Sequence, residues 1–239
     1  MLVLGIETSG TRGSVALCRD EELLAEHVFE EGPRHARNIV VAVDDVVRST
    51  GVAKSDIGAV AVSEGPGSFT GLRVGVTCAK TLAHLLRWQA VGVPSLEVMA
   101  QNVDPEHHGC ATTCPLLDAR RSFVYGTVFR WEGGRWRDTT GVMAGEPERV
   151  LERLPRGTLI FGSGVEAYPE VFVRGQVAAE ELSLKVGAAA LAQGSAKHVA
   201  VLGLRILREG GAVPPMELMP KYYRRTEAEE KLDKPNDEP

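Results

Sequence analysis

The sequence lacks the features that would place a protein in or across a membrane. Its 239 residues contain no apolar run long enough to span a bilayer, and no basic segment precedes an apolar one at the start. The four cysteines include no CxxC pair, which argues against a zinc ribbon and a disulfide framework and favours buried thiols. The formal net charge of -5 gives no reason to expect a nucleic-acid footprint along the whole chain. These absences favour a globular cytoplasmic protein.

The usual sequence signs of an active site are also scarce. The six histidines are not spaced as metal ligands, and no Gly-x-Ser-x-Gly motif is present. Lone acids such as Glu64 and Glu97 have no recognisable catalytic partner. We therefore expect neither a metal site nor a catalytic residue in this chain.

The length allows one large domain or two ordinary ones. Residues 102–109 are polar and contain proline and glycine, so they are the best candidate for a boundary. We predict a first domain over residues 1–103 and a second over residues 104–220. Residues 221–239 are rich in charge and poor in core-forming side chains, which predicts a charged, partly disordered tail.

Each half begins with patterns typical of antiparallel strands and continues with alternating helix and strand. In the first half we expect strands at Leu2–Glu7, Ser14–Cys18, Leu23–Phe29, Ile57–Ser63 and Ala90–Val93, and helices at Ala36–Ser49 and Phe69–Leu86. In the second half we expect strands at Thr113–Asp118, Phe123–Arg130, Trp136–Val142 and Thr158–Phe161, and helices at Glu146–Leu154, Glu181–Gln193 and Ala196–Glu209. This order predicts an α/β fold with an internal structural repeat.

The run from Gly65 to Gly75 is the most informative stretch, because it places many small residues between a strand and the start of a helix. Helix N-termini carry free N–H groups and partial positive charge. Either an anion or another protein chain could be received there.

The helix that follows carries a face of small residues at intervals of four, and it is apolar on several sides. Such a face allows another backbone to approach closely, either from a partner protein or from the sheet of the same subunit. For the first alternative, the residues expected at a partner or dimer interface are Phe69, Gly71, Leu72, Gly75, Val76, Ala79 and Ala83.

Polar turns at the ends of two strands are candidates for nucleotide contact. Hydroxyls and glycines in a hairpin can present oxygens and N–H groups to phosphate, although an ordinary polar turn has the same composition. The candidate contacts are Thr8, Ser9, Gly13, Ser14, Asp118, Gly162, Ser163 and Gly164. A further aromatic and basic cluster, Pro220–Arg225, could contact RNA or form a docking edge for another helix.

Several of these motifs together resemble the TsaB (YeaZ-like) family of bacterial tRNA threonylcarbamoyladenosine biosynthesis proteins. The motifs are GIETS at Gly5–Ser9, GSVAL at Gly13–Leu17, GPGSFTGLRVG at Gly65–Gly75, DAR at Asp118–Arg120 and PKYYR at Pro220–Arg224. The resemblance implies an actin-like ATPase fold (ASKHA, ribonuclease-H-like) with two lobes, each a β-meander followed by an α/β unit.

The resemblance also implies a function. The family is needed to attach a threonylcarbamoyl group to the adenosine beside the anticodon of tRNAs that read codons beginning with A. It implies a noncatalytic scaffold that binds and stabilises the catalytic paralogue TsaD, together with the ATPase TsaE, and that forms a homodimer when TsaD is absent. The tRNA is then the substrate of the complex. No cofactor of this chain is implied, although ATP or ADP at a partner interface is compatible with it.

One comparison with the catalytic paralogue can be made by position. That paralogue carries two metal-binding histidines after its own Gly-Pro-Gly helix, where this chain has Ser95 and Met99 after Pro94. Serine and methionine do not replace a histidine pair at such a site. The alternative hypothesis is an independent actin-like ATPase or small-molecule kinase that uses the hairpin at Thr8–Ser14, Asp118 and the Gly162–Gly164 turn.

Overall fold

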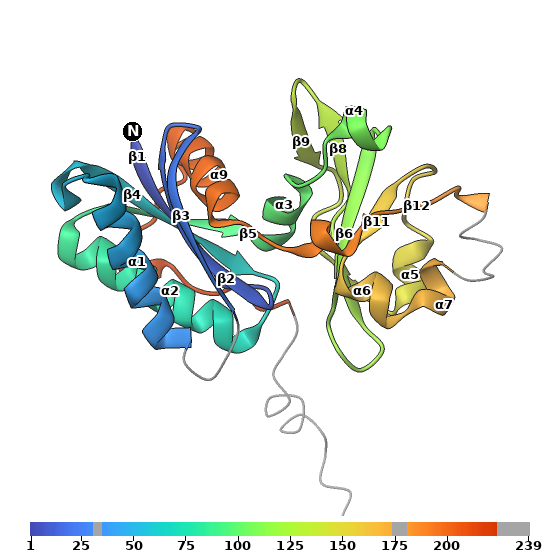
Figure 1. The fold of residues 1–239 in the computed structure, drawn as a ribbon. Coiled ribbons are helices and arrows are strands. Elements are labelled where there is room, and N and C mark those ends of the chain that lie inside the picture. Colours follow the sequence, from blue (N-terminus) through green and yellow to red (C-terminus); the bar gives the residue numbers. More distant parts are fainter. Residues whose placement is uncertain (31–34, 174–180, 224–239) are drawn as a thin grey trace, which may run out of the picture.

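The computed structural model describes residues 1–30, 35–173 and 181–223, which form two lobes, each built on one β-sheet (Figure 1). The charged tail expected at the C-terminus falls beyond these residues from 224 onward, whereas 221–223 are described. No helix in the described part of the chain is both long and apolar enough to cross a membrane.

The first lobe contains five strands in the order β3-β2-β1-β4-β5. They are β1 (Leu2–Glu7), β2 (Arg12–Arg19), β3 (Glu22–Glu30), β4 (Ile57–Gly65) and β5 (Gln89–Pro94). The first three form an antiparallel meander, and β4 and β5 extend the sheet in parallel from β1. The strands predicted from the sequence are therefore all present.

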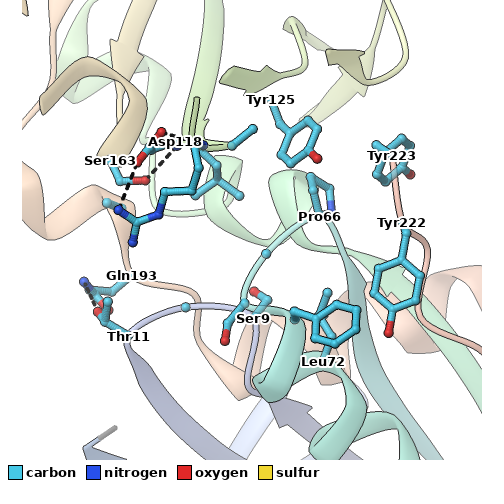
Figure 2. Close-up of a pocket in the computed structure, with 18 of the residues that line it drawn as sticks. Ser9, Thr11, Pro66, Leu72, Asp118, Tyr125, Ser163, Gln193, Tyr222 and Tyr223 are labelled. Carbon is cyan, nitrogen blue, oxygen red and sulfur yellow. Dashed lines mark hydrogen bonds and ion pairs between the residues drawn. The ribbon is translucent and has the colours of Figure 1, made fainter. Parts of the chain in front are cut away.

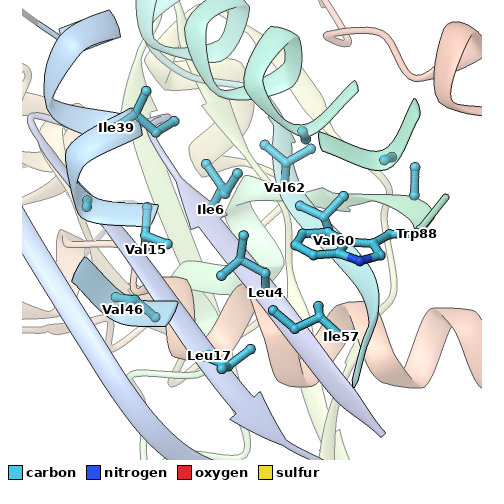
Figure 3. Packing of buried hydrophobic residues seen from close by; sticks show 14 of the residues in the cluster. Leu4, Ile6, Val15, Leu17, Ile39, Val46, Ile57, Val60, Val62 and Trp88 are labelled. Carbon is cyan, nitrogen blue, oxygen red and sulfur yellow. The ribbon is translucent and has the colours of Figure 1, made fainter. Parts of the chain in front are cut away.

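Both faces of this sheet are covered. Alternate residues of one strand point to opposite faces, so Val60 and Val62 lie in the cluster beneath α1 (His35–Thr50) and α2 (Phe69–Leu86), together with Leu4 and Ile6 (Figure 3). Their neighbours Ala59 and Ala61 lie in a second cluster, formed with α9 (Ala196–Arg208) on the other face. Small side chains on this face let α9 pack close to the sheet.

The position of α9 differs from the predicted domain boundary. The helix belongs by sequence to residues 104–220, but it packs against β1, β2 and β4 of the first lobe. The chain then continues over this lobe, where Val213 forms an antiparallel bridge with Ala90 of β5. The first lobe is thus completed by the C-terminal part of the chain.

The second lobe repeats the strand order of the first. Its path is β10-β7-β6-β11-β12, with β6 antiparallel to β7 and parallel to β11. The strands are β6 (Thr112–Asp118), β7 (Val124–Gly126), β8 (Phe129–Glu132), β9 (Arg135–Asp138), β10 (Met143–Gly145), β11 (Leu159–Phe161) and β12 (Lys185–Val186). The internal repeat predicted from the sequence is therefore confirmed.

Two details of this lobe differ from the predictions. The single strand expected over Phe123–Arg130 is interrupted: β7 pairs with β6 and β10, whereas β8 pairs with β6 and β9. The helix expected over Glu181–Gln193 is wrong, because this stretch contains the short edge strand β12 and the 3-10 turn η2 (Ala189–Ala192). Leu182 and Leu184, two residues apart, both pack on the lobe's core, which is the period of a strand.

The remaining helices cover the second sheet and connect the lobes. On one face lie α5 (Pro147–Leu151), α6 (Ser163–Ala167) and α7 (Pro169–Phe172), and the connecting segment contains α3 (Ser95–Ala100) and α4 (Pro105–His108). Leu96 and Met99 of α3 pack in a cluster with Phe129 and Trp136 of the second lobe.

The cysteines are unpaired, and burial raises the pKa of Cys114 to about 12. Buried thiols are the prediction for all four cysteines; it is confirmed for Cys18, Cys110 and Cys114, whereas Cys78 is only partly buried.

Candidate functional site in the interlobe cleft

A cleft of about 700 Å³ lies between the lobes and receives residues from several segments that are far apart in the sequence (Figure 2). The first hairpin contributes Ser9 and Thr11, the glycine-rich loop contributes Pro66, the second lobe contributes Asp118, and the C-terminal segment contributes Tyr222. Of the candidate nucleotide contacts, Ser9, Asp118 and Ser163 line this cleft.

The Glu7 carboxylate, at the start of the hairpin between β1 and β2, accepts hydrogen bonds from groups of the first lobe. Glu7 is 1% exposed, and its Oε1 accepts bonds from the Ser9 amide and hydroxyl, both at 2.6 Å. Its Oε2 accepts a bond from the Ser63 hydroxyl. Burial raises the pKa of Glu7, and these hydrogen bonds oppose that rise. The carboxylate is therefore enclosed beneath the cleft.

The other hydroxyls of this hairpin also have partners inside the protein. The Thr8 hydroxyl donates to the carbonyl of Gly71 at 2.8 Å. The Ser14 hydroxyl accepts a bond from the amide of Ala196, the first residue of α9, at 2.9 Å. Gly13 lies against the ring of Phe29. These three candidates therefore hold the hairpin to α2, α9 and β3, and they do not line the cleft.

The glycines of the turn after β11 have a packing role. A Cβ added at Gly162 would lie 2.3 Å from the carbonyl oxygen of Leu116, and one at Gly164 would lie 3.0 Å from the Leu116 Cβ. Gly162 also has a φ of 109°, which side chains rarely adopt. Gly162 and Gly164 therefore allow α6 to approach β6 and do not line the cleft, and their contact with a nucleotide stays a prediction.

Asp118 ends β6 at the cleft and is held in place by the residues around it. Its amide donates to the Ser163 hydroxyl at 3.0 Å, and its Oδ1 accepts a bond from the Arg120 amide at 2.8 Å. The Arg120 guanidinium lies 3.5 Å from Oδ2. Arg120, Arg121 and Ser122 all have positive φ, so the turn after Asp118 is strained at the edge of the cleft.

The small-residue face of α2 packs inside the chain. A Cβ on Gly71 would lie 2.0 Å from the Thr8 carbonyl oxygen, and one on Gly75 would lie 2.2 Å from the Thr8 Oγ1. The neighbouring predicted interface residues Leu72, Val76, Ala79 and Ala83 are between 0% and 2% exposed. Six of the seven residues are therefore covered within the chain itself, which favours the alternative that this face packs on the sheet of the same subunit. The exception is Phe69, which is 43% exposed.

The positions that correspond to the paralogue's metal ligands do not fit a metal. Ser95 is fully buried, and its hydroxyl accepts a bond from the Gly65 amide at 3.1 Å. Met99 is 3% exposed and packs in the core between α3 and the second sheet. Among the described residues no group of three His, Cys, Asp or Glu side chains could hold a metal ion. We therefore derive no chemistry through a metal at this position.

The C-terminal segment from Val213 to Tyr223, called the strap below, is a part of the site that the domain prediction missed. Lys80 of α2 donates to the Met216 carbonyl at 3.0 Å, and the Lys221 amide donates to the Glu64 carbonyl at 2.7 Å. The strap therefore follows α2 back to the glycine-rich loop. The signal for it was the Pro220–Arg225 cluster, for which a docking edge was one of two alternatives.

A second surface lies on the outer side of the α1 and α2 layer. Val40 is 62% exposed and Leu85 is 72% exposed. The same two helices carry further apolar side chains that are partly buried against the core. With these two residues the surface, called the helical face below, consists of Val40, Val43, Val74, Cys78, Leu82 and Leu85.

Two lobes that repeat one strand order around a cleft define the actin-like ATPase class of fold. The family model of TsaD, tRNA N6-adenosine threonylcarbamoyltransferase, matches residues 23–232. The tRNA threonylcarbamoyladenosine biosynthesis protein TsaB of Bacillus subtilis is 30% identical, with 97% of each chain covered. TsaB of Escherichia coli is also 30% identical, over 97% of this chain and 98% of its own. The chain belongs to the TsaB family.

The fold agrees with this assignment. The structure of YeaZ from Pseudomonas aeruginosa superimposes with a TM-score of 0.78 and 25% sequence identity, over 92% of this chain and 99% of that one. The two-lobed arrangement is thus shared along almost the whole chain.

Proposed function

We propose that this chain is a noncatalytic accessory subunit in the threonylcarbamoylation of the adenosine beside the anticodon of tRNA. In this role it binds and stabilises the threonylcarbamoyltransferase TsaD, together with the ATPase TsaE, in the cytoplasm. The tRNA is the substrate of the complex, and the chain forms a homodimer when TsaD is absent.

The helical face is the observation that carries this proposal. Val40 and Leu85 expose 62% and 72% of their surface on neighbouring helices. Exposed apolar surface of this kind marks interaction sites on proteins. The partner that fits it best is another pair of helices, because two apolar helix layers pack against each other as in a helix bundle.

A partner of the same fold explains both binding modes in the proposal. A paralogue with the same topology presents an equivalent layer of two helices. A second copy of this chain would present the identical layer, and a two-fold axis would pair the face with itself. The homodimer and the heterodimer would therefore compete for one surface.

The residues of the cleft support an accessory role over an independent catalyst. The hydroxyls of Thr8 and Ser14, which a phosphate would need, are bonded to Gly71 and Ala196. Ser95 and Met99 supply neither the imidazoles nor the open geometry of a metal centre. This combination of a buried hairpin and an exposed helical face supports the scaffold role.

The proposal is tested by charging the helical face without disturbing the core. Val40→Asp and Leu85→Asp replace exposed side chains, so the fold should persist while the apolar contact with TsaD is lost. We expect at least a tenfold weaker Kd by calorimetry for the double variant, with a matching loss of reconstituted tRNA modification. Val186→Asp, at a position 52% exposed on β12, is the matched control. Unchanged affinity in a folded double variant would contradict the proposal.

A further inference from the structure

Aromatic side chains from three segments gather at one edge of the cleft. The rings of Phe69 and Tyr222 have centroids 5.2 Å apart, and those of Tyr125 and Tyr223 have centroids 6.2 Å apart. Tyr125 comes from the second lobe, Phe69 from α2 and the two C-terminal tyrosines from the strap, and all line the same cleft (Figure 2). These four rings are called the aromatic rim below.

The aromatic rim remains accessible although its rings touch one another. Phe69 is 43% exposed, Tyr222 is 44% and Tyr223 is 38%. Trp131, on β8 of the second lobe, is the other exposed large aromatic residue in the described part of the chain. Exposed aromatic surface is thus concentrated at the cleft, where a planar ligand could stack on it.

A cation lies within the rim. The guanidinium carbon of Arg73 is 3.9 Å from the Phe69 ring centroid, and its Nε donates to the Tyr222 hydroxyl at 2.9 Å. Arg73 has no carboxylate partner among the described residues, so its charge is available to a ligand. On the opposite side of the cleft, Arg120 is 87% exposed beside Asp118. Arginines on either side of stacked rings suit a ligand that carries both bases and phosphates.

The rim is held in place before any ligand arrives. Lys221 forms an ion pair with Glu64 at 2.6 Å, immediately before the two tyrosines. A Cβ on Gly65 would lie 2.6 Å from the Lys221 carbonyl oxygen, so the strap and the glycine-rich loop are in close contact. Fixing the rings in this way reduces the entropy lost on binding. The cleft volume of about 700 Å³ is in the range of small-ligand sites and accommodates an extruded base.

We propose that the aromatic rim and Arg73 bind unpaired nucleotides of RNA, with bases stacked on Tyr222 and Tyr223 and a phosphate beside Arg73. Single-stranded nucleic acid is recognised in this way, by aromatic platforms next to cationic side chains. The inference rests on the proposed function, in which tRNA is the substrate of the complex, and it assigns to this chain a direct contact with the anticodon loop. The formal charge of -5 does not oppose it, because the contact is local.

The test measures RNA binding and partner binding separately. The probe is an unmodified, fluorescently labelled anticodon stem-loop transcript of a tRNA that reads a codon beginning with A. Its anisotropy is recorded with the full chain alone and with the chain mixed with TsaD, over a series of salt concentrations. The variants are Tyr222→Ala, Tyr223→Ala and Arg73→Ala. Trp131→Ala is the matched aromatic control, and Arg149→Ala, at an exposed arginine of α5, is the matched cationic control.

We expect each tyrosine variant to weaken RNA binding about tenfold. We expect Arg73→Ala to reduce the slope of the logarithm of the RNA-binding constant against the logarithm of salt concentration by roughly one, because one fewer counterion is released. Both controls should bind as the parent chain does, and all variants should keep their affinity for TsaD, which the helical face determines. Ultraviolet crosslinking of the probe to Tyr222 or Tyr223 would be a second supporting result.

Two outcomes would overturn the inference. One is unchanged RNA affinity in folded tyrosine variants, with crosslinks elsewhere. The other is loss of TsaD or TsaE binding in those variants with no effect on RNA, which would make the rim a protein-docking surface. Failure of the proposed function would give a different result: the variant with Val40→Asp and Leu85→Asp would bind TsaD as tightly as the parent chain does.

Discussion

The ammonium group of Lys221 lies 2.6 Å from the Glu64 carboxylate, and this pair joins the strap to the strand that leads into the cleft. Glu64 is 9% exposed on its side chain, whereas Lys221 is 58% exposed. The hydrogen bond with Glu64 raises the pKa of Lys221, so the lysine stays charged at neutral pH. This ion pair, together with the bond from the Lys221 amide to the Glu64 carbonyl, holds the strap directly before the two C-terminal tyrosines.

Lys221→Met should destabilise the protein, because it leaves the Glu64 carboxylate enclosed without its partner. We expect a loss of about 1–2 kcal/mol in the free energy of unfolding, below the cost for a fully buried pair because Lys221 is partly solvated. Urea denaturation measures it. Lys54→Met, at an exposed lysine of η1 (Lys54–Asp56), is the control and should be neutral. Equal stability of both variants would show that the pair contributes nothing.

Gly75→Ala should destabilise the first lobe and leave the partner surface intact. The new Cβ would lie 2.2 Å from the Thr8 Oγ1, so α2 must move away from the hairpin. We expect a loss of about 1–3 kcal/mol in the free energy of unfolding. Thr77→Ala, on the exposed side of the same helix, should change stability little. Loss of TsaD affinity in a Gly75→Ala variant of unchanged stability would contradict this interpretation.

Glu7→Gln should stabilise the protein at neutral pH. Burial raises the pKa of Glu7 above the ordinary value of 4.5, so the folded protein holds this proton more tightly than the unfolded chain. The contribution to stability is present below pH 4.5 and is lost as the pH rises through the higher pKa of the folded state. We expect a gain of about 1 kcal/mol at pH 7 from removing the buried charge.

The pH dependence of Glu7→Gln distinguishes this explanation from a general effect on packing. The parent chain should lose free energy of unfolding as the pH rises above 4.5, and the variant should lack this part of the dependence. Urea denaturation at a series of pH values measures it. A variant less stable than the parent chain at pH 7 would show that the hydrogen bonds to Ser9 and Ser63 require the carboxylate.

The sequence predicted the architecture better than it predicted the site. Short apolar runs such as those of β1 and β4, and the repetition of a meander in each half, depend on local residues and are visible in the sequence. The sequence does not show which sheet α9 packs against, because a helix with one apolar face can pack on either sheet. The same limit applies to Gly75: spacing shows that something approaches closely, and only the structure shows that it is Thr8.

The strap illustrates the other limit of the sequence. The aromatic and basic residues of Pro220–Arg225 were recognised as a cluster, but the pairing of Lys221 with Glu64 joins residues far apart in the chain. Asp118 and Ser163 were both candidate contacts, and the structure brings them together at one hydrogen bond. Single candidates were therefore accessible to sequence reasoning, whereas their neighbours across the cleft were not.

Magnesium ATP should not raise the melting temperature of the chain in the absence of partners. A ligand that binds only the folded state stabilises it by RT ln(1 + [L]/Kd), which keeps growing as the free ligand exceeds Kd, so thermal unfolding is a sensitive test. The Thr8 hydroxyl donates to the Gly71 carbonyl, the Ser14 hydroxyl accepts from the Ala196 amide, and both residues are buried, so neither presents a hydroxyl to a phosphate in the cleft. The comparison is made with and without millimolar nucleotide, for the parent chain and for Asp118→Asn. A saturable rise that disappears in Asp118→Asn would favour the alternative hypothesis of an independent ATPase or kinase.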